Sequence, residues 1–239
     1  MEVKKIVIIG NSVALRNRPH VKEQSLNYGQ LISNGLNTKE SETLYVIENI
    51  AFGRATMPDL HKVADQIVNT FGDLYIINIG VSDAATREMS RWFGDILNQR
   101  KQTLKVKIAK GISKFIHLPF RTVLVKLRGR RAWTSKVLFE KLFSELLHKI
   151  QHNTSGKIIV IPLSLANERV EGIVPGTNKN YKEFNQILHK VCETNEVNLL
   201  NLDDLDSKID YPDGTHFSEA GNKKVANKIL SLIQYKKYV

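Results

Sequence analysis

The strongest constraint on the fold is a series of short apolar runs, most of them closed by a glycine or a proline. The first run, KKIVII, is rich in β-branched residues and stops at Gly10. Continuous runs of this kind are typical of strands that are buried on both faces of a sheet. Five strands are predicted on this basis, at residues 4–9, 43–47, 74–79, 157–161 and 197–202.

Helical patterns lie between and after these runs. Helices are predicted at residues 30–36, 58–70, 180–195 and 218–234. Strands that alternate with helices indicate βαβ units and a parallel sheet. We therefore expect one α/β domain over residues 1–239, a three-layer doubly wound sandwich around a parallel five-stranded sheet of the flavodoxin-like type.

Three features bear on the setting in which the chain works. No apolar run approaches the roughly 20 residues that are needed to cross a bilayer. The apolar part of the opening MEVKKIVIIGNS is too short for a signal-peptide core and fits a first strand better. Cys192 is the single cysteine, so an intrachain disulfide is impossible. Together these features favour a reducing, cytoplasmic location.

The net charge of +11 comes from one segment of the chain. Residues 84–156 exceed the length of an ordinary crossover, and we expect them to form a helical insertion within the domain. Between residues 96 and 139 there is no Asp or Glu, whereas twelve basic residues lie at 100–136. The rest of the chain holds 23 basic and 24 acidic residues and is nearly neutral. The insertion therefore needs an explanation of its own.

The insertion also shows amphipathic helical patterns. Over residues 104–118, the Leu, Ile and Phe side chains fall on one side of a helix, opposite Lys107, Lys110 and Lys114. Pro119 is expected to end or kink this helix. A second amphipathic helix is predicted over residues 137–150.

Three interpretations of this basic segment stay open. In the first, the basic residues form a face that only solvent contacts. In the second, residues 100–136 make a peripheral contact with an anionic membrane. In the third, they form a surface that captures an anionic or lipid-linked glycan. Nucleic acid is the least favoured partner, because no recognition motif and no row of interleaved aromatic residues accompanies the charges.

Residues that are able to carry acyl chemistry follow the predicted strands. Ser12 comes directly after the first strand, Gly53 follows the second and Ser82 the third, while Asp213 and His216 precede the last helix. The carboxyl ends of parallel strands share one edge of the sheet, and sites form there. A serine becomes a nucleophile when an imidazole accepts its proton and a carboxylate orients that imidazole. Ser12, His216 and Asp213 are therefore candidate catalytic residues.

This set of motifs resembles the SGNH (GDSL-like) hydrolase superfamily of esterases, lipases and carbohydrate acyl hydrolases or transferases. DGTHFSEAGN is similar to the family's D-x-x-H block and its S-x-x-G helix start, and G-N-S is similar to its G-D-S block. The resemblance implies Ser12 as the nucleophile, His216 as the base and Asp213 as the carboxylate that orients it. It also implies the backbone N–H groups of Ser12 and Gly53 as oxyanion donors.

Two positions depart from the family pattern. Asn11 replaces the usual Asp of the nucleophile block and keeps its size and an acceptor oxygen. Ser82 replaces the Asn of the third block, G-x-N-D, and loss of that oxyanion donor costs roughly 10²–10³ in rate. The Ser82 hydroxyl, Arg54 or Arg87 could donate in its place. Asn11, Arg54, Asp83 and Arg87 are the candidate substrate-binding residues.

These observations favour a serine ester hydrolase that needs no cofactor and removes acetyl or other acyl groups from a carbohydrate. The carbohydrate follows from the resemblance alone. Two alternatives stay open: an O-acyltransferase that passes the acyl group to a sugar hydroxyl, and a glycan- or membrane-binding protein without turnover. His148 and His152 have a metal-like spacing, but no third ligand is apparent, so no metal site is expected.

Overall fold

A computed structural model describes residues 1–15, 25–38, 41–99, 101 and 103–236. Its centre is a five-stranded sheet in which every neighbouring pair is parallel, with the order β2-β1-β3-β4-β5. The prediction of a doubly wound α/β fold is thereby confirmed. The strands are β1 (Glu2–Gly10), β2 (Thr43–Ala51), β3 (Leu74–Asn78), β4 (Lys157–Val160) and β5 (Asn198–Leu199).

The two outer strands differ in length from their predictions. β2 is longer than predicted because it pairs with β1 along its whole length, from Glu2 opposite Thr43 to Gly10 opposite Ala51. β5 shrinks to two residues, because it lies at the edge of the sheet and pairs only with the end of β4. Pairing with a neighbour, which local sequence does not encode, sets both lengths.

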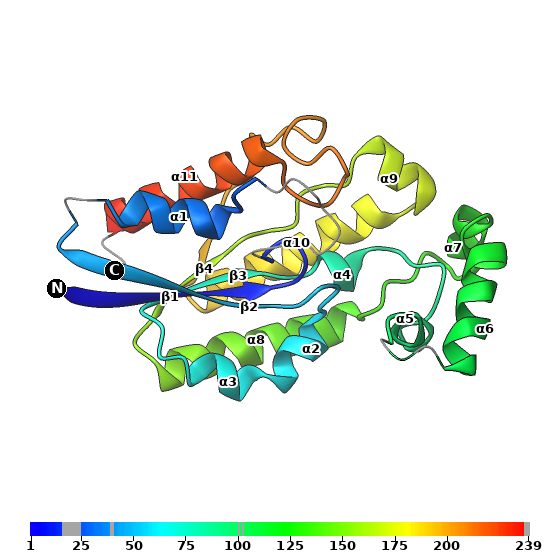
Figure 1. The fold of residues 1–239 in the computed structure, drawn as a ribbon, viewed down its shortest axis with the longest axis horizontal. Coiled ribbons are helices and arrows are strands. Elements are labelled where there is room, and N and C mark those ends of the chain that lie inside the picture. Colours follow the sequence, from blue (N-terminus) through cyan, green and yellow to red (C-terminus); the bar gives the residue numbers. More distant parts are fainter. Residues whose placement is uncertain (16–24, 39–40, 100, 102, 237–239) are drawn as a thin grey trace.

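Alternate side chains of the central strands enter two separate cores. Ile6 and Ile8 of β1 pack under α1 and α11, whereas Val7 and Ile9 face α2, α3, α8 and α10. Figure 1 shows α1 and α11 on one side of the sheet and α2, α3 and α8 on the other. The covering helices are α1 (Tyr28–Leu36), α2 (Met57–Lys62), α3 (Ala64–Val68), α8 (Lys136–Asn153), α10 (Thr177–Thr194) and α11 (Glu219–Lys236).

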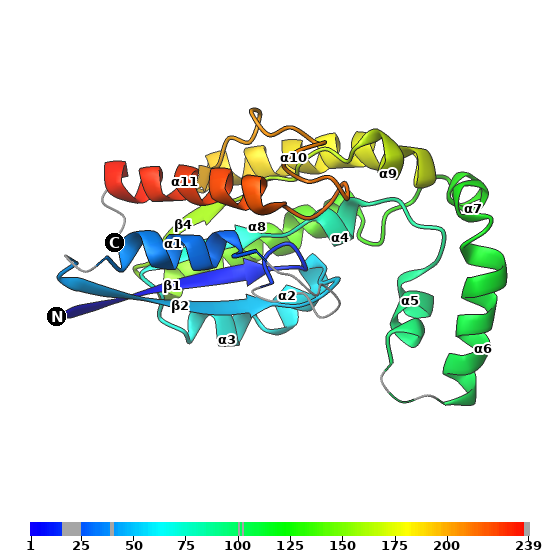
Figure 2. The same cartoon turned by 45° about the horizontal axis from the view of Figure 1, so that its top comes forward.

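The segment 84–156 divides into two parts that pack differently. α8 is a regular layer helix, since it contacts α2, α3 and α10 and buries Phe139, Phe143, Leu146, Leu147 and Ile150. The other helices, α5 (Arg91–Leu97), α6 (Leu104–Ile112), the π-helix η1 (Ser113–His117) and α7 (Arg121–Leu127), stand apart at one end of the molecule (Figure 2). The expectation of one insertion over 84–156 is therefore corrected. α8 belongs to the sandwich, because it completes the second core, and the helices before it are the ones that stand apart.

Smaller differences concern individual helices. The helix predicted at 58–70 is broken at Val63 into α2 and α3, while α4 (Val81–Ala84) and α9 (Glu168–Ile173) are short and were not predicted. Pro119 lies in the turn between η1 and α7, as predicted for a residue that ends or kinks the helix. Among the described residues, no helix has both the length and the apolarity that crossing a bilayer requires.

Candidate active site

The candidate residues meet at the carboxyl ends of the strands. The turn after β1 carries Ser12 and is tied to its neighbours by two backbone hydrogen bonds, from Asn11 N–H to the Asn78 carbonyl (3.2 Å) and from Phe52 N–H to the Gly10 carbonyl (3.1 Å). The ends of β1, β2 and β3 are therefore held together around Ser12. β1 and β2 run toward the end of the molecule where α4 lies (Figure 2).

Three side chains from distant parts of the chain form one hydrogen-bonded line. The Nε2 atom of His216 lies 3.0 Å from the Oγ atom of Ser12. The Nδ1 atom of the same ring lies 2.7 Å from Oδ2 of Asp213. A proton can thus pass from the hydroxyl to Nε2 while the carboxylate accepts a hydrogen bond from Nδ1–H, which is the geometry that activates a serine.

The loop before α11 fixes Asp213 and His216 through its own backbone. Oδ1 of Asp213 accepts from the N–H groups of Thr215 (2.8 Å) and His216 (2.7 Å), so one carboxylate oxygen shapes the turn and the other orients the ring. Gly214 has a φ of 81°, a conformation that glycine adopts without steric cost. The two residues are therefore oriented by a rigid local turn.

The carboxylate of Asp213 is stabilised in its ionised form. Burial by itself raises the pKa of Asp213, but the hydrogen bonds from the ring and the backbone N–H of His216 outweigh it and hold the pKa at about 2. The Asp213 carboxyl is therefore an anion at neutral pH. It therefore accepts the Nδ1–H bond and stabilises positive charge on the imidazole.

The three candidate oxyanion donors lie at this edge as well. Within the described part of the chain, no hydrogen bond joins the backbone N–H of Ser12 or Gly53 to another residue. Gly53 is exposed, and a Cβ built on it would meet no atom within 4 Å. Ser82, in the first turn of α4, is only 5% exposed. The backbone N–H groups of Ser12 and Gly53 therefore have no partner among the described residues.

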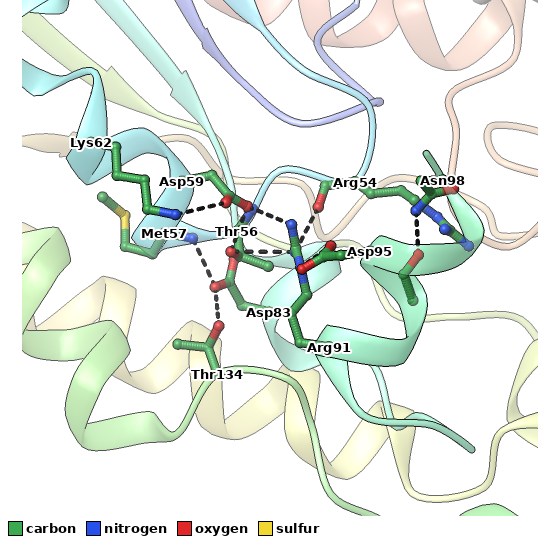
Figure 3. Close-up of polar contacts among 11 residues, drawn as sticks. Arg54, Thr56, Met57, Asp59, Lys62, Asp83, Arg91, Asp95, Asn98 and Thr134 are labelled. Atoms are coloured by element: carbon green, nitrogen blue, oxygen red, sulfur yellow. Dashed lines mark hydrogen bonds and ion pairs between the residues drawn. The ribbon is translucent and has the colours of Figure 1, made fainter. Parts of the chain in front are cut away.

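Asn11 and Asp83 have a different role from the one predicted. Both are fully buried, so neither side chain reaches a substrate, and the expectation of substrate contact is corrected. Oδ1 of Asn11 accepts from Val13 N–H (2.9 Å) and shapes the turn that carries Ser12. Oδ1 of Asp83 accepts from Met57 N–H (2.8 Å) and the Thr134 hydroxyl (2.6 Å), and so joins α4 to α2 (Figure 3).

Burial of the Asp83 carboxyl disfavours its ionised form. Desolvation raises its pKa to about 6, although the Thr134 and Met57 hydrogen bonds and the charge of Arg91 lower it. Its Oδ2 atom has no partner among the described residues. Asp83 therefore links α4 to α2 and to Thr134 through a fully buried carboxyl.

The other two candidates, Arg54 and Arg87, belong to a group of arginines around one aromatic ring. The guanidinium carbon of Arg87 lies 4.3 Å from the centroid of Trp133, and those of Arg91 and Arg54 lie at 5.1 and 6.0 Å. Burial lowers the pKa of Arg87 to about 10, and the pKa of Arg54 is lowered by burial and by Arg91. The group is cationic at neutral pH and lies beside the loop that carries Gly53.

Among these arginines, acidic side chains neutralise the charge of Arg91, whereas Arg54 and Arg87 have no acidic partner among the described residues. Arg91 pairs with Asp59 (3.0 Å) and Asp95 (2.8 Å) and donates to the carbonyl of Arg54 (Figure 3). No ion pair joins Arg54 or Arg87 to a described acidic residue. The exposed Arg54 side chain remains available to an anionic or hydroxyl-rich ligand, whereas Arg87 is largely enclosed against Trp133.

Sequence reasoning missed the residues that support the site from a distance. Thr134, which holds Asp83, and Trp133, on which the arginines stack, lie some fifty residues beyond α4 in the chain. Asn222 of α11 accepts a hydrogen bond from the backbone N–H of Tyr28 (3.0 Å) and so joins α11 to α1. Their residue types are common, and only their places in the fold reveal their contacts.

Comparisons with known proteins agree with this geometry at the level of the fold. Scans of family models and of curated proteins find no match to the sequence. Solved structures do match. A lipase/acylhydrolase from Enterococcus faecalis aligns with a TM-score of 0.64 at 15% identity and covers 98% of this chain and 96% of its own. The chain shares the fold of this lipase/acylhydrolase.

Two acetylxylan esterases share this fold as well. Axe2 from Geobacillus stearothermophilus aligns with a TM-score of 0.64 at 16% identity, covering 96% of this chain and 94% of that protein. The acetyl xylan esterase AlAXEase aligns with a TM-score of 0.61 at 19% identity, covering 96% and 99%. The match extends over nearly the whole length of each aligned chain, so the likeness is one of the complete fold and not of a single motif.

Proposed function

We propose that this protein is a serine ester hydrolase that removes acetyl or other small acyl groups from a carbohydrate. One observation carries the proposal, the hydrogen-bonded line from Ser12 Oγ through both ring nitrogens of His216 to Asp213. The shared fold supports it, because proteins described as acetylxylan esterases and as a lipase/acylhydrolase are built on the same sheet.

The first half-reaction forms an acyl-enzyme. Ser12 Oγ attacks the ester carbonyl while Nε2 of His216 takes the hydroxyl proton, and the negative charge moves to the carbonyl oxygen. The N–H groups of Ser12 and Gly53 and the Ser82 hydroxyl donate to that oxyanion. The C–O bond of the ester then breaks, and His216 returns the proton to the departing sugar oxygen.

Water completes the second half-reaction. His216 takes a proton from water, the resulting hydroxide attacks the acyl carbonyl, and Ser12 leaves with the proton held on Nε2. The products are a carboxylic acid and the free enzyme. A sugar hydroxyl in place of water would give acyl transfer with the same proton movements, so the acceptor alone distinguishes the two reactions.

A fluorophosphonate probe tests the nucleophile directly. We expect wild-type protein to be labelled and Ser12→Ala to be unlabelled, while Ser231→Ala, at an exposed serine of α11, keeps full labelling. Absence of labelling on folded wild-type protein would contradict the proposal and favour a binding protein without turnover.

Ester hydrolysis gives the matching kinetic prediction. Ser12→Ala and His216→Ala should each lower kcat on a small acetyl ester by about 10⁴-fold or more, and the double variant should lose no more than either single one, because the residues act as a unit. Asp213→Ala should lower it by a similar or smaller factor. Near wild-type turnover in Ser12→Ala would refute the assignment.

Product analysis with acetylated xylo-oligosaccharides tests the substrate. Release of free acetate without modification of added sugar is the expected result. Acetyl groups that appear on an added sugar acceptor would identify transfer as the reaction.

A further inference from the structure

The helices that stand apart from the sandwich expose an unusual amount of apolar surface. Of the 23 large hydrophobic residues that are exposed in the described chain, ten lie between residues 92 and 127. Soluble monomers seldom gather large apolar side chains in this way, and such gatherings mark interaction sites. The ten are Trp92, Leu104, Ile108, Ile112, Phe115, Ile116, Leu118, Phe120, Val123 and Leu127.

The arrangement along α6 shows that these residues are not the inner face of the helix. Val106 and Ala109 are the residues of α6 that are buried, and they pack against Ile96 of α5. Leu104 and Ile108, one turn apart, are 73% and 55% exposed. The helix thus has a small buried face against its neighbour and a second apolar face that nothing in the described chain covers.

α7 repeats this arrangement on a shorter scale. Its Val125 is fully buried, whereas Val123 and Leu127, at i and i+4, are 53% and 77% exposed. Phe115 of η1, 71% exposed, extends the apolar surface between the two helices. We call these exposed apolar side chains of α6, η1 and α7, together with Trp92, the apical face.

Several basic side chains near the apical face have no acidic partner among the described residues. Within the described part of the segment, ion pairs hold Arg121 (with Glu88) and Lys136 (with Glu183), whereas Lys107, Lys126 and Arg131 pair with no described acidic group. Lysine ammonium groups also lie against exposed rings, with Lys105 Nζ 5.1 Å from the Trp92 centroid and Lys114 Nζ 5.5 Å from Phe115. Lys105 and Lys114 thus lie directly beside exposed aromatic rings of the apical face.

We propose that the apical face docks on an anionic lipid surface. Short helices with bulky apolar residues and flanking lysines lie in the interfacial plane of a bilayer, where apolar side chains enter the acyl boundary and ammonium groups meet lipid phosphates. Trp92 beside Lys105 is a pairing suited to the headgroup region, because an indole has one apolar and one polar part.

Other occupants fit these observations less well. An acidic glycan would satisfy the cations but offers little apolar surface for Leu104, Phe115 and Leu127 to contact. A second copy of the chain would cover the apolar side chains but bring two sets of uncompensated lysines together, which costs association free energy. A bilayer that contains anionic lipid accepts both kinds of side chain at once.

The helices α6 and α7, which carry most of the apical face, lie at the end of the molecule toward which β1 and β2 run (Figure 2). That is the end at which the strands carry the candidate active site. Docking would therefore hold the site on the membrane side of the molecule. The docking itself rests on the exposed side chains alone and needs no ester chemistry.

Vesicle co-sedimentation of the full chain tests the proposal. Vesicles of phosphatidylcholine with phosphatidylglycerol are compared with pure phosphatidylcholine, each at low and high salt. We expect binding to the anionic vesicles only, weakened at high salt because exposed charges are screened beyond about 8 Å at physiological ionic strength. Ser12→Ala should bind like wild type, so the result is independent of catalysis.

Two pairs of variants separate the charge from the apolar contribution. Lys107→Gln with Lys114→Gln should weaken anionic-vesicle binding about fivefold for each lysine, whereas Lys62→Gln with Lys141→Gln, two exposed lysines elsewhere, should not. Phe115→Ala should weaken binding roughly tenfold, whereas Phe71→Ala should have no effect. The two phenylalanines are matched, at 71% and 70% exposure.

Three results would overturn the proposal. The first is no sedimentation with anionic vesicles. The second is equal loss of binding in the test and control variants. The third is absence of vesicle binding together with another kind of association. Salt-sensitive binding to an acidic polysaccharide would identify a glycan as the occupant. Self-association that Phe115→Ala abolishes would identify a second copy of the chain.

Discussion

By its resemblance to SGNH hydrolases, the sequence has Ser82 where an Asn usually donates to the oxyanion. Ser82 lies in the first turn of α4 and is 5% exposed, and its hydroxyl is shorter than an Asn amide. An Asn at this position would present its N–H₂ group further toward the reacting carbonyl. The two side chains therefore differ in how well they can stabilise the transition state.

We expect Ser82→Asn to raise, or at least to preserve, kcat/KM on simple acetyl esters. One recovered oxyanion hydrogen bond contributes up to roughly 3 kcal/mol in the transition state when its geometry is good. Steady-state kinetics with wild type and Ser82→Ala as references would measure it. A marked loss in a well-folded Ser82→Asn protein would show that the hydroxyl has a role that the amide does not perform.

Asp83 gives a prediction on stability. Its folded pKa of about 6 lies above the ordinary 3.8, so the folded state binds a proton more tightly than the unfolded state does. The free energy of unfolding should therefore fall as pH rises between about 4 and 6, by roughly 3 kcal/mol, and stay level above. In Asp83→Asn this decrease should disappear. Urea denaturation at pH 4 and pH 8 measures it, and an unchanged pH dependence would contradict the burial argument.

At the scale of elements, the start of α11 is fitted closely against the loop that carries Asp213 and His216. A Cβ on Gly221 would overlap the carbonyl oxygen of Asp210, a backbone atom that cannot turn aside. The same carbonyl accepts a hydrogen bond from Ser218 N–H (2.7 Å) at the start of the helix. The position of the catalytic loop thus depends on the absence of a side chain one turn away.

Gly221→Ala should lower both stability and ester hydrolysis. Overpacking of this kind costs about 1–3 kcal/mol, and relief by movement of the loop would displace His216 from Ser12. Gly172→Ala is the control, because a Cβ there meets no atom within 4 Å and a helical alanine is favoured over glycine. Thermal denaturation and kcat would measure the pair, and two indistinguishable variants would refute the close-packing argument.

At the scale of the whole molecule, the positive charge and the candidate chemistry occupy different parts. Six of the twelve basic residues of 100–136 lie in α6, η1 and α7, which stand outside the layers, whereas Ser12, Asp213 and His216 lie on the sandwich itself. Screening limits the reach of exposed lysines to about 8–10 Å in physiological salt. The lysines beside the apical face should therefore affect binding to a membrane and not the rate of ester cleavage.

Lys107→Gln with Lys114→Gln should accordingly leave kcat/KM on a neutral, soluble ester within about twofold of wild type. The same variant loses vesicle binding under the proposal above. Measuring both properties on one preparation separates the two roles. A large loss of soluble-ester activity would mean that these lysines help to build the active site.

The sequence by itself determined the parallel sheet and the order of the reacting groups. Apolar runs that end in glycine define strands wherever they are buried on both faces, and the turn after a strand must lie at the edge of the sheet, so the place of Ser12 followed from local pattern. The D-x-x-H spacing likewise fixed the partner of His216, because the contact is made within one turn.

Only the tertiary structure decided which apolar faces are covered. Periodicity shows that α6 and α8 are both amphipathic, but it does not show that α8 closes the second core while Leu104 and Ile108 stay exposed. The same holds for Asp83, whose buried role depends on Thr134, and for Trp133 among its arginines. Such contacts join residues far apart in the chain, and their free energy depends on neighbours that no local pattern specifies.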